Sequence, residues 1–85
     1  MAYQVLVDPA AQRELKKLPG DVRQRVANLI SSLEREPRPA GVKKLGGSEN
    51  SYRLRVGDFR ILYRIEDRKL VVLVVRVAHR RDVYR

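Results

Sequence analysis

Arginines that alternate with apolar residues in the second half of the chain are the side chains best suited to chemistry. The run Tyr-Arg-Leu-Arg-Val-Gly-Asp-Phe-Arg-Ile-Leu-Tyr at residues 52–63 contains Arg53, Arg55 and Arg60. Because side chains alternate across a strand, Arg53 and Arg55 share one face of a predicted sheet, and a hairpin turn at Gly57-Asp58 would add Arg60 to it. Like charges directly opposite one another destabilise a sheet, and a guanidinium group can donate two hydrogen bonds to a phosphate. We therefore expect a polyanion, above all a nucleic acid backbone, to supply the missing negative charge.

A second segment, His-Arg-Arg-Asp-Val-Tyr at residues 79–84, adds groups for proton transfer and phosphate binding. Histidine changes its charge near neutral pH, so His79 is the candidate acid or base. Either Arg80 or Arg81 is the phosphate ligand, because adjacent residues of an extended chain point apart. Tyr84 either stacks on a base or takes part in proton transfer, although an ordinary tyrosine, with a pKa of about 10, is a poor base at neutral pH.

Each of these side chains also has an ordinary structural explanation. Arg53 and Arg55 could be only the solvent-facing side of an amphipathic strand. His79 could be a hydrogen-bonded residue at a strand end, and Tyr84 a packed terminal aromatic residue. Arg60 is harder to explain in this way, because it combines the expected charge clash across a hairpin with the alternating motif.

The net charge of +9 is concentrated in the second half of the chain. Residues 1–42 contain seven Lys or Arg and five Asp or Glu, which gives +2, whereas residues 43–85 contain twelve and five, which gives +7. Such a basic excess indicates a nucleic acid or an acidic protein as partner, with a merely solvated basic surface as the alternative.

Length and composition exclude several classes of protein. A chain of 85 residues has no material for a second core, so we expect one domain over residues 1–85. The absence of cysteine and the single histidine argue against a disulfide framework and against a metal site, and we expect no cofactor. No apolar run reaches about 18 residues, and the first residues lack the features of a secretion signal. We therefore expect a cytoplasmic protein with no membrane association.

The elements that must position the arginines begin with a strand at residues 3–7. A helix is predicted to follow, capped by Asp8 with Pro9 at its first position, and to end at Pro19-Gly20. A second helix is predicted from Asp21, whose spacing to Gln24 resembles a capping box, to a point before Pro37. Their apolar stripes are Ala11, Leu15 and Leu18 in the first helix, and Val22, Val26, Leu29, Ile30 and Leu33 in the second. Residues 37–51 are predicted to be a loop, in which Lys43, Lys44 and Leu45 form a fragment of strand or a turn.

From residue 51 the apolar period changes from 3.6 to 2, which predicts an antiparallel hairpin around Gly57-Asp58. In this register Arg55 lies opposite Arg60, and Arg53 opposite Leu62. A second hairpin, around Asp67-Arg68, is predicted to pair Ile65 with Leu70 and to place Arg60 opposite Val75 and His79 on the arginine face. The result is an α+β fold: a strand, two helices and an antiparallel three-stranded meander. The helices cover one face of the sheet, and the apolar residues Leu62, Val71, Leu73 and Val75 lie among the arginines on the other, where a partner segment would cover them.

This order of elements, together with the two arginine-containing segments, resembles the RelE/ParE superfamily of bacterial and archaeal toxin–antitoxin systems. The resemblance covers nearly the whole chain. It implies a microbial-RNase-like α+β fold and, for the RelE branch, ribosome-dependent cleavage of mRNA in the ribosomal A site. The family's functional residues fall on Arg53, Arg55, Arg60, Arg80 and Tyr84. Better-known members have lysines at the first two of these positions, and this departure matters because arginine cannot practically lose its proton to act as a base.

The resemblance also implies partners. They are a cognate antitoxin, in a hetero-oligomer that binds operator DNA through the antitoxin, and the ribosome with its mRNA. Two other functions stay open at this point: a ParE-like inhibitor of DNA gyrase without nuclease activity, and a non-toxic nucleic-acid-binding module.

Overall fold

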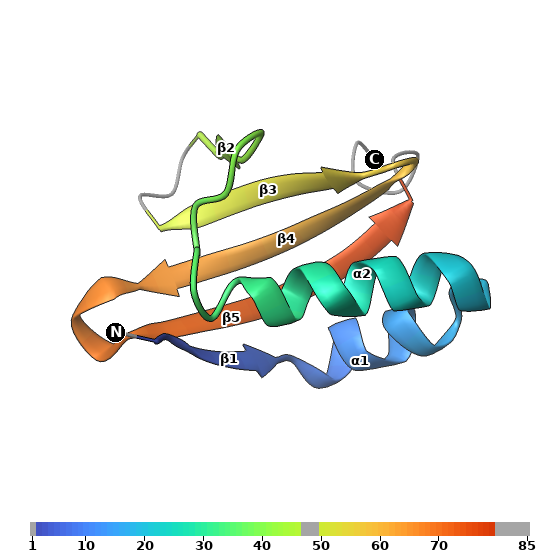
Figure 1. Cartoon of the computed structure of the whole chain (residues 1–85), viewed down its shortest axis with the longest axis horizontal. Helices are drawn as coiled ribbons and strands as arrows, with labels where there is room; N and C mark the ends of the chain where they lie inside the picture. The colour runs from blue at the N-terminus through green and yellow to red at the C-terminus, as the bar shows by residue number, and fades with distance from the viewer. Residues whose placement is uncertain (1, 47–49, 80–85) are drawn as a thin grey trace.

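Five strands form one mixed sheet in the order β1-β5-β4-β3-β2, and the two helices lie over one of its faces (Figure 1). The computed structural model describes residues 2–46 and 50–79. The expected α+β fold is confirmed, with β1 parallel to β5 and β2 added as the outer strand beside β3. The elements in chain order are β1 (Gln4–Val7), α1 (Pro9–Lys16), α2 (Gly20–Ser32), β2 (Lys43–Lys44), β3 (Ser51–Val56), β4 (Phe59–Glu66), a 3-10 turn (Asp67–Lys69) and β5 (Val71–His79).

Helix α1 begins as its sequence predicts. The Asp8 side chain accepts a hydrogen bond from the backbone N–H of Ala10 at 3.0 Å, and Pro9 occupies the first turn, where a missing N–H costs nothing. Ala11 is fully buried, and Leu18 is buried in the turn that follows the helix. No helix in the described part of the chain is long and apolar enough to span a membrane.

The N-cap of helix α2 lies two residues before the predicted Asp21, and the predicted capping box is wrong. Pro19 is the N-cap residue and makes no side-chain hydrogen bond, so Asp21 lies inside the first turn. The Pro19 carbonyl accepts the first helical bond, from Arg23 N at 2.8 Å. The apolar stripe holds as predicted: Val26, Ile30 and, just beyond the helix end, Leu33 are buried against the sheet.

The first hairpin has the predicted register. Arg55 pairs with Arg60, and Arg53 pairs with Leu62. Gly57 has a φ of 58°, which a two-residue turn with glycine at its first central position requires. The side chains of β3 therefore alternate between a buried face and an open one.

The predicted register of the second hairpin is wrong. The 3-10 turn and Leu70, which has a left-handed φ of 53°, make a longer connection, so Glu66 pairs with Val71. Ile65 thus pairs with Val72 in place of the predicted Leu70. This shift of two residues alone keeps every side chain on its predicted face. A β-bulge between Leu62 and Tyr63 then adds one more residue on β5 and reverses the faces beyond it.

The segment after α2 is bound to the core face by two tyrosines. The Tyr63 hydroxyl donates a hydrogen bond to the Pro37 carbonyl at 2.8 Å, and the rings of Tyr52 and Tyr63 stack with centroids 5.9 Å apart. Tyr63 is fully buried, and this burial raises its pKa to about 12. These contacts fix where the chain enters the loop before β2.

Arg38 lies next to this anchor, in a set of contacts that we call the Arg38 cluster (Arg38, Asp67, Tyr3 and Tyr52). Its guanidinium group donates to both carboxylate oxygens of Asp67, at 2.8 and 3.2 Å, and lies 5.2 Å from the centroid of the Tyr52 ring. Tyr3 donates to the same carboxylate at 2.7 Å. The hydrogen bond from Arg38 holds the pKa of Asp67 below its ordinary value. The cluster joins the start of the chain, the loop and the β4–β5 turn.

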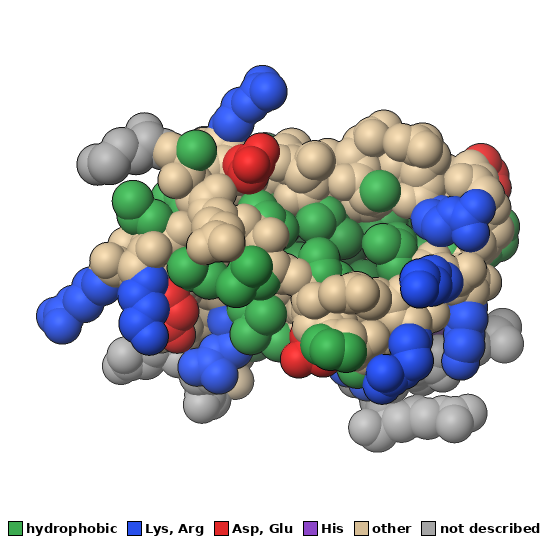
Figure 2. Space-filling view, turned by 90° about the horizontal axis from the view of Figure 1, so that it is seen from below, with side chains coloured by type: hydrophobic (Ala, Val, Ile, Leu, Met, Phe, Trp, Pro, Cys, Tyr) green, Lys and Arg blue, Asp and Glu red, His purple; other side chains and the backbone are tan. Residues whose placement is uncertain are grey.

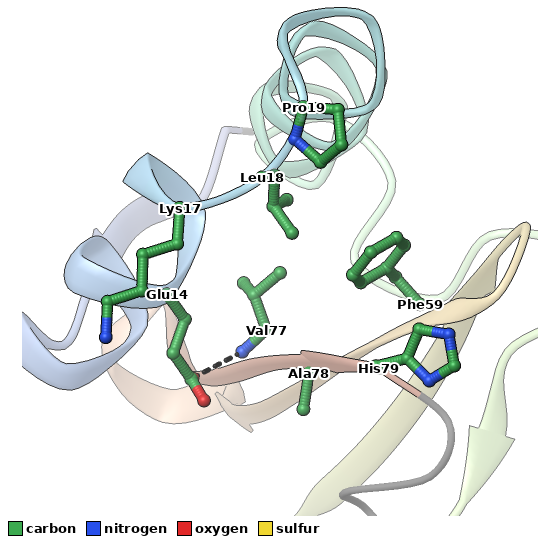
Figure 3. Close-up of a pocket in the computed structure, with 8 residues that line it drawn as sticks. All are labelled: Glu14, Lys17, Leu18, Pro19, Phe59, Val77, Ala78 and His79. Atoms are coloured by element: carbon green, nitrogen blue, oxygen red, sulfur yellow. Dashed lines mark hydrogen bonds between the residues drawn. The ribbon is translucent and has the colours of Figure 1, made fainter.

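Glu14 completes the edge of β5 where β1 has ended. The last contact of the β1 segment with β5 is the bond from Asp8 N to Val74 O at 2.9 Å. Beyond it, the Glu14 carboxylate accepts from the backbone N–H of Val77 at 2.9 Å (Figure 3). It also accepts from the Arg76 side chain at 2.9 Å. A helix side chain thus satisfies a strand edge that would otherwise be exposed.

An apolar hollow remains on the side of β1 and α1. Figure 2 shows apolar side chains gathered there, and the groove has a volume of about 260 Å³. It is lined by Val5, Val7, Leu15, Ala27, Ile30, Ser31 and Glu34.

Candidate nucleic-acid interface

Three of the predicted site residues meet on the sheet face opposite the helices. Arg53 and Arg55 project from β3 and Arg60 from β4, while the alternate residues Tyr52, Leu54 and Val56 are buried in the core. The prediction that these arginines share one face is therefore confirmed. The two-residue turn at Gly57 sets this arrangement, because it fixes the register of the hairpin.

The arginines line a small cavity on this face, which we call the basic cavity. Its volume is about 120 Å³, enough for a ligand the size of several water molecules, and its lining consists of Gly41, Lys43, Arg53, Arg55 and Arg60. Among the described residues, no carboxylate lines it. The cavity is thus lined by four cationic side chains and one glycine, and it favours an anion.

Arg60 is the most informative of these side chains, because it is a buried cation. Only 7 % of its surface is exposed. Its Nη1 donates to the backbone oxygen of Phe59 at a long 3.4 Å. On β5 the residue opposite is Ala78, which has a small side chain. A buried charge is costly unless an opposite charge accompanies it, so the position of Arg60 favours a bound anion.

Arg55 and Arg53 flank this buried cation. The Nε of Arg55 donates to the Gly57 carbonyl at 3.2 Å, which ties an otherwise exposed side chain to the hairpin turn. Arg53 is half-buried, with Leu62 as its partner on β4 and Lys43 as its partner on β2. Guanidinium groups at these positions can approach one phosphate from two sides.

His79 does not lie in the basic cavity, which corrects the sequence prediction. The β-bulge reverses the faces of β5, so His79 pairs with Phe59, and their rings meet edge to face with centroids 5.4 Å apart. Figure 3 shows both side chains beside Leu18 and Pro19, around a pocket of about 340 Å³ near the end of α1. The other predicted residues, Arg80 with its alternative Arg81, and Tyr84, lie outside the described residues.

Sequence reasoning missed Lys43 as a member of this site. The sequence predicts a fragment of strand or a turn at residues 43–45, but the length of a loop does not tell which residues on β3 such a fragment would pair with. The structure pairs Lys43 with Arg53, which places it on the arginine face. A signal was present: consecutive residues of a strand face opposite sides of the sheet, so one of the two adjacent lysines of a strand here would lie on the arginine face.

The open face also carries apolar side chains, as expected. Leu62, Val71 and Leu73 are half-buried, and Val75 lies at the bulge. Leu6 of β1, which pairs with Leu73, is 43 % exposed. The sheet face opposite the helices thus combines a basic end at β2–β3 with an apolar end at β1–β5.

Comparisons with known proteins show the family of the chain. The model of the family described as the ParE toxin of the type II toxin–antitoxin system parDE matches residues 5–84. The chain is 36 % identical over 86 residues to the toxin RelG of Mycobacterium tuberculosis, covering 100 % of this chain and 99 % of the relative. It is 33 % identical over 82 residues to the mRNA interferase toxin RelE of Escherichia coli, covering 94 % and 85 %.

Solved structures show the same fold. An archaeal RelE–RelB complex from Pyrococcus horikoshii superposes with a TM-score of 0.84 at 29 % identity, covering 94 % of this chain and 97 % of the other. The toxin–antitoxin complex RelBE2 from Mycobacterium tuberculosis gives a TM-score of 0.80 at 34 % identity, with coverages of 93 % and 99 %. The chain therefore belongs to the RelE/ParE superfamily, as a RelE-like toxin of a type II toxin–antitoxin system.

Proposed function

We propose that this toxin is an endoribonuclease that cuts mRNA on the ribosome, in the A site. The observation that carries the proposal is the buried Arg60 cation in a cavity lined by three further cationic side chains. A phosphodiester supplies the anion that this cavity favours. A relative of 33 % identity is named an mRNA interferase, which supports the same activity. The work of such an enzyme lies in the cytoplasm, where mRNA is translated.

The proposed reaction is attack of the RNA's own 2′-hydroxyl on the adjacent phosphorus, with release of the 5′-oxygen of the next nucleotide. Arg60 holds the phosphate, and Arg53 and Arg55 stabilise the negative charge that develops on its oxygens. Arg80 is proposed as a further phosphate ligand. The proton of the 2′-hydroxyl needs an acceptor, and arginine cannot take this role. Since His79 lies on the other face, Tyr84 is the member of the predicted set that stays a candidate for proton transfer.

We infer that a cognate antitoxin restrains this activity. The structures of relatives described above are complexes with antitoxins. On this chain, an acidic segment would neutralise the basic cavity, and its apolar residues would cover Leu6, which is exposed. The complex is proposed to be a hetero-oligomer that binds operator DNA through the antitoxin.

Primer extension on mRNA from a translating extract tests the activity. The wild-type chain is expected to produce new cuts within the translated region, and Arg60→Ala to abolish them. Arg64→Ala is the matched control, because Arg64 lies on the same face of β4 but is exposed and paired with Glu66 at 3.8 Å. Cuts that persist in Arg60→Ala would contradict the proposed role of the cavity. Equal cutting of naked RNA would remove the ribosome from the mechanism.

A second candidate function is inhibition of DNA gyrase, which the match to the ParE family model favours. A supercoiling assay on the same purified chain separates the two. Inhibited supercoiling with intact mRNA would replace the nuclease proposal, whereas mRNA cuts with normal supercoiling would support it.

A further inference from the structure

The outer strand β2 carries two consecutive lysines whose side chains face opposite sides of the sheet. Lys43 pairs with Arg53, and Lys44 pairs with the core residue Tyr52. Residues paired across a ladder project to the same face, so Lys43 belongs to the arginine face and Lys44 does not. The cavity lining shows the same difference, since it includes Lys43 and not Lys44.

The backbone around Lys43 is held in place, although β2 is only two residues long. Gly41 has a φ of 88°, a left-handed conformation that suits glycine, and lets the chain turn into the strand. The Val42 N–H donates to Pro39 O at 3.1 Å, and the Leu45 N–H donates to Ser51 O at 2.8 Å, beside the short ladder. Lys43 therefore projects from a paired segment and not from an irregular loop.

The four cations form a diagonal row across three strands. Arg55 and Arg60 face each other across β3 and β4, and Lys43 and Arg53 face each other across β2 and β3. With strands about 4.8 Å apart and alternate residues about 6.6 Å apart along a strand, the backbone positions of Arg60 and Lys43 are about 12 Å apart. The long side chains converge from these positions on one cavity. Lys43 approaches it from the sheet edge, opposite Arg60.

We propose that Lys43 is a fourth cationic contact to the RNA backbone, an assignment that rests on the proposed ribonuclease function. Its ammonium group is a compact charge that binds a phosphate oxygen without the two-bond geometry of arginine. It reaches the phosphate from β2, so the substrate strand extends across β3 to the edge of the sheet. Each phosphate contact by a basic side chain releases counterions, which makes its loss visible in the salt dependence of binding.

The test compares Lys43→Ala with Lys44→Ala. Both changes remove one positive charge from adjacent, exposed positions of one strand, and they differ in the face that they affect. The readouts are mRNA cleavage in a translating extract and binding of a 2′-O-methyl RNA decamer, whose nucleophile is blocked, over a series of salt concentrations. We expect Lys43→Ala to reduce cleavage and binding roughly tenfold and to lower the salt slope of binding by about one. Lys44→Ala should stay within about twofold of wild type, and Lys43→Arg should restore most of the lost activity, because it keeps the charge.

The outcomes separate this inference from the proposed function. If Arg60→Ala abolishes cleavage while Lys43→Ala and Lys44→Ala behave alike, the function stands and the role of Lys43 is overturned. A Lys43→Arg variant as weak as Lys43→Ala would also overturn a contact based on charge. If the wild-type chain neither cuts mRNA nor binds the decamer, the proposed function has failed, and the inference fails with it.

Discussion

Arg38 and Arg60 both lie against the sheet, but their charges have different surroundings. The guanidinium group of Arg38 makes two hydrogen bonds to the Asp67 carboxylate and lies over an aromatic ring. Arg60 is buried, donates one long hydrogen bond to the backbone of Phe59, and lines a cavity with three further cationic side chains. The charge of Arg38 is matched by a carboxylate, whereas the charged side chains that line the cavity with Arg60 are, in the described part of the chain, all of its own sign.

The difference separates structural from functional arginines in a chain that has many of them. The Arg38 cluster joins segments distant in sequence, so its charge stabilises the native state. The basic cavity brings four cationic side chains together with no carboxylate in its described lining, which is the arrangement expected of a site for an external anion. The same residue type therefore has opposite roles, decided by its neighbours.

The largest expected effects come from replacing each of the two arginines by alanine in turn. Arg60→Ala should lower the rate of mRNA cleavage by at least about 100-fold, because it removes a positioned donor to the developing charge. Its melting temperature should be unchanged or higher, because the change removes a buried cation that has no carboxylate partner among the described residues. Arg38→Ala should do the reverse, with a lower melting temperature and less than about tenfold loss of cleavage per folded molecule. Calorimetry and a cleavage time course on both variants check this, and a parallel loss of both properties in both variants would erase the distinction.

Ligand binding sharpens the comparison further. A blocked RNA decamer that binds only the native state should raise the melting temperature of the wild-type chain. At a hundred times its dissociation constant, it should add about 2.7 kcal/mol to the free energy of unfolding. Arg38→Ala should show the same increase from its lower starting point. Arg60→Ala should show little or none. An equal increase in all three chains would mean that the RNA binds elsewhere.

The anchor beside the Arg38 cluster should affect stability alone. Tyr63→Phe removes the donor to the Pro37 carbonyl, and the free energy of unfolding should fall by about 1–2 kcal/mol. Denaturant unfolding measures this loss. Cleavage by the folded variant should match that of wild type, and a strong loss of cleavage would show that the anchor also shapes the basic cavity.

Alkaline pH tests the same tyrosine. Burial raises the pKa of Tyr63 to about 12, so its neutral form stabilises the fold fully below the ordinary value of about 10. This stabilisation is lost as the pH rises from about 10 through 12. Wild type should therefore lose more stability than Tyr63→Phe over that range, measured by unfolding at fixed temperature. Identical pH profiles would contradict the burial argument.

The smallest effect is expected at Asp67, whose side chain is 54 % exposed. The hydrogen bond from Arg38 lowers its pKa, so the stabilisation is present above about pH 4 and is lost as the pH falls through the lowered value. Asp67→Asn should be slightly less stable than wild type at neutral pH and equal to it in stronger acid. A difference in stability between wild type and Asp67→Asn that grows as the pH falls would contradict this prediction.

The sequence predicted those features that depend on local pattern. The alternation of residues 51–56 and the Gly57-Asp58 turn sufficed to place Arg55 opposite Arg60, because a two-residue turn leaves one register. The Asp8-Pro9 helix start was predictable because the capping side chain and the N–H group that it binds are close together in the sequence.

The features that the sequence did not predict depend on distant or irregular structure. Leu70 adopts a left-handed conformation with no glycine to signal it, and the bulge near Tyr63 adds a residue that no local pattern marks. The longer turn keeps every side chain on its face, and the bulge places His79 on the face opposite the arginines. The bond between Tyr3 and Asp67 joins residues 64 positions apart, so no local spacing indicates it.

The most direct test of the difference between the two arginines is NMR of their Nε–Hε groups in the 15N-labelled chain, titrated with the blocked RNA decamer. Arg38→Lys and Arg60→Lys variants assign the two signals. We expect the Arg60 signal to shift progressively and the Arg38 signal to stay in place. A shift of Arg38 without Arg60, or equal small shifts of both, would contradict the assignment of the basic cavity as the phosphate site.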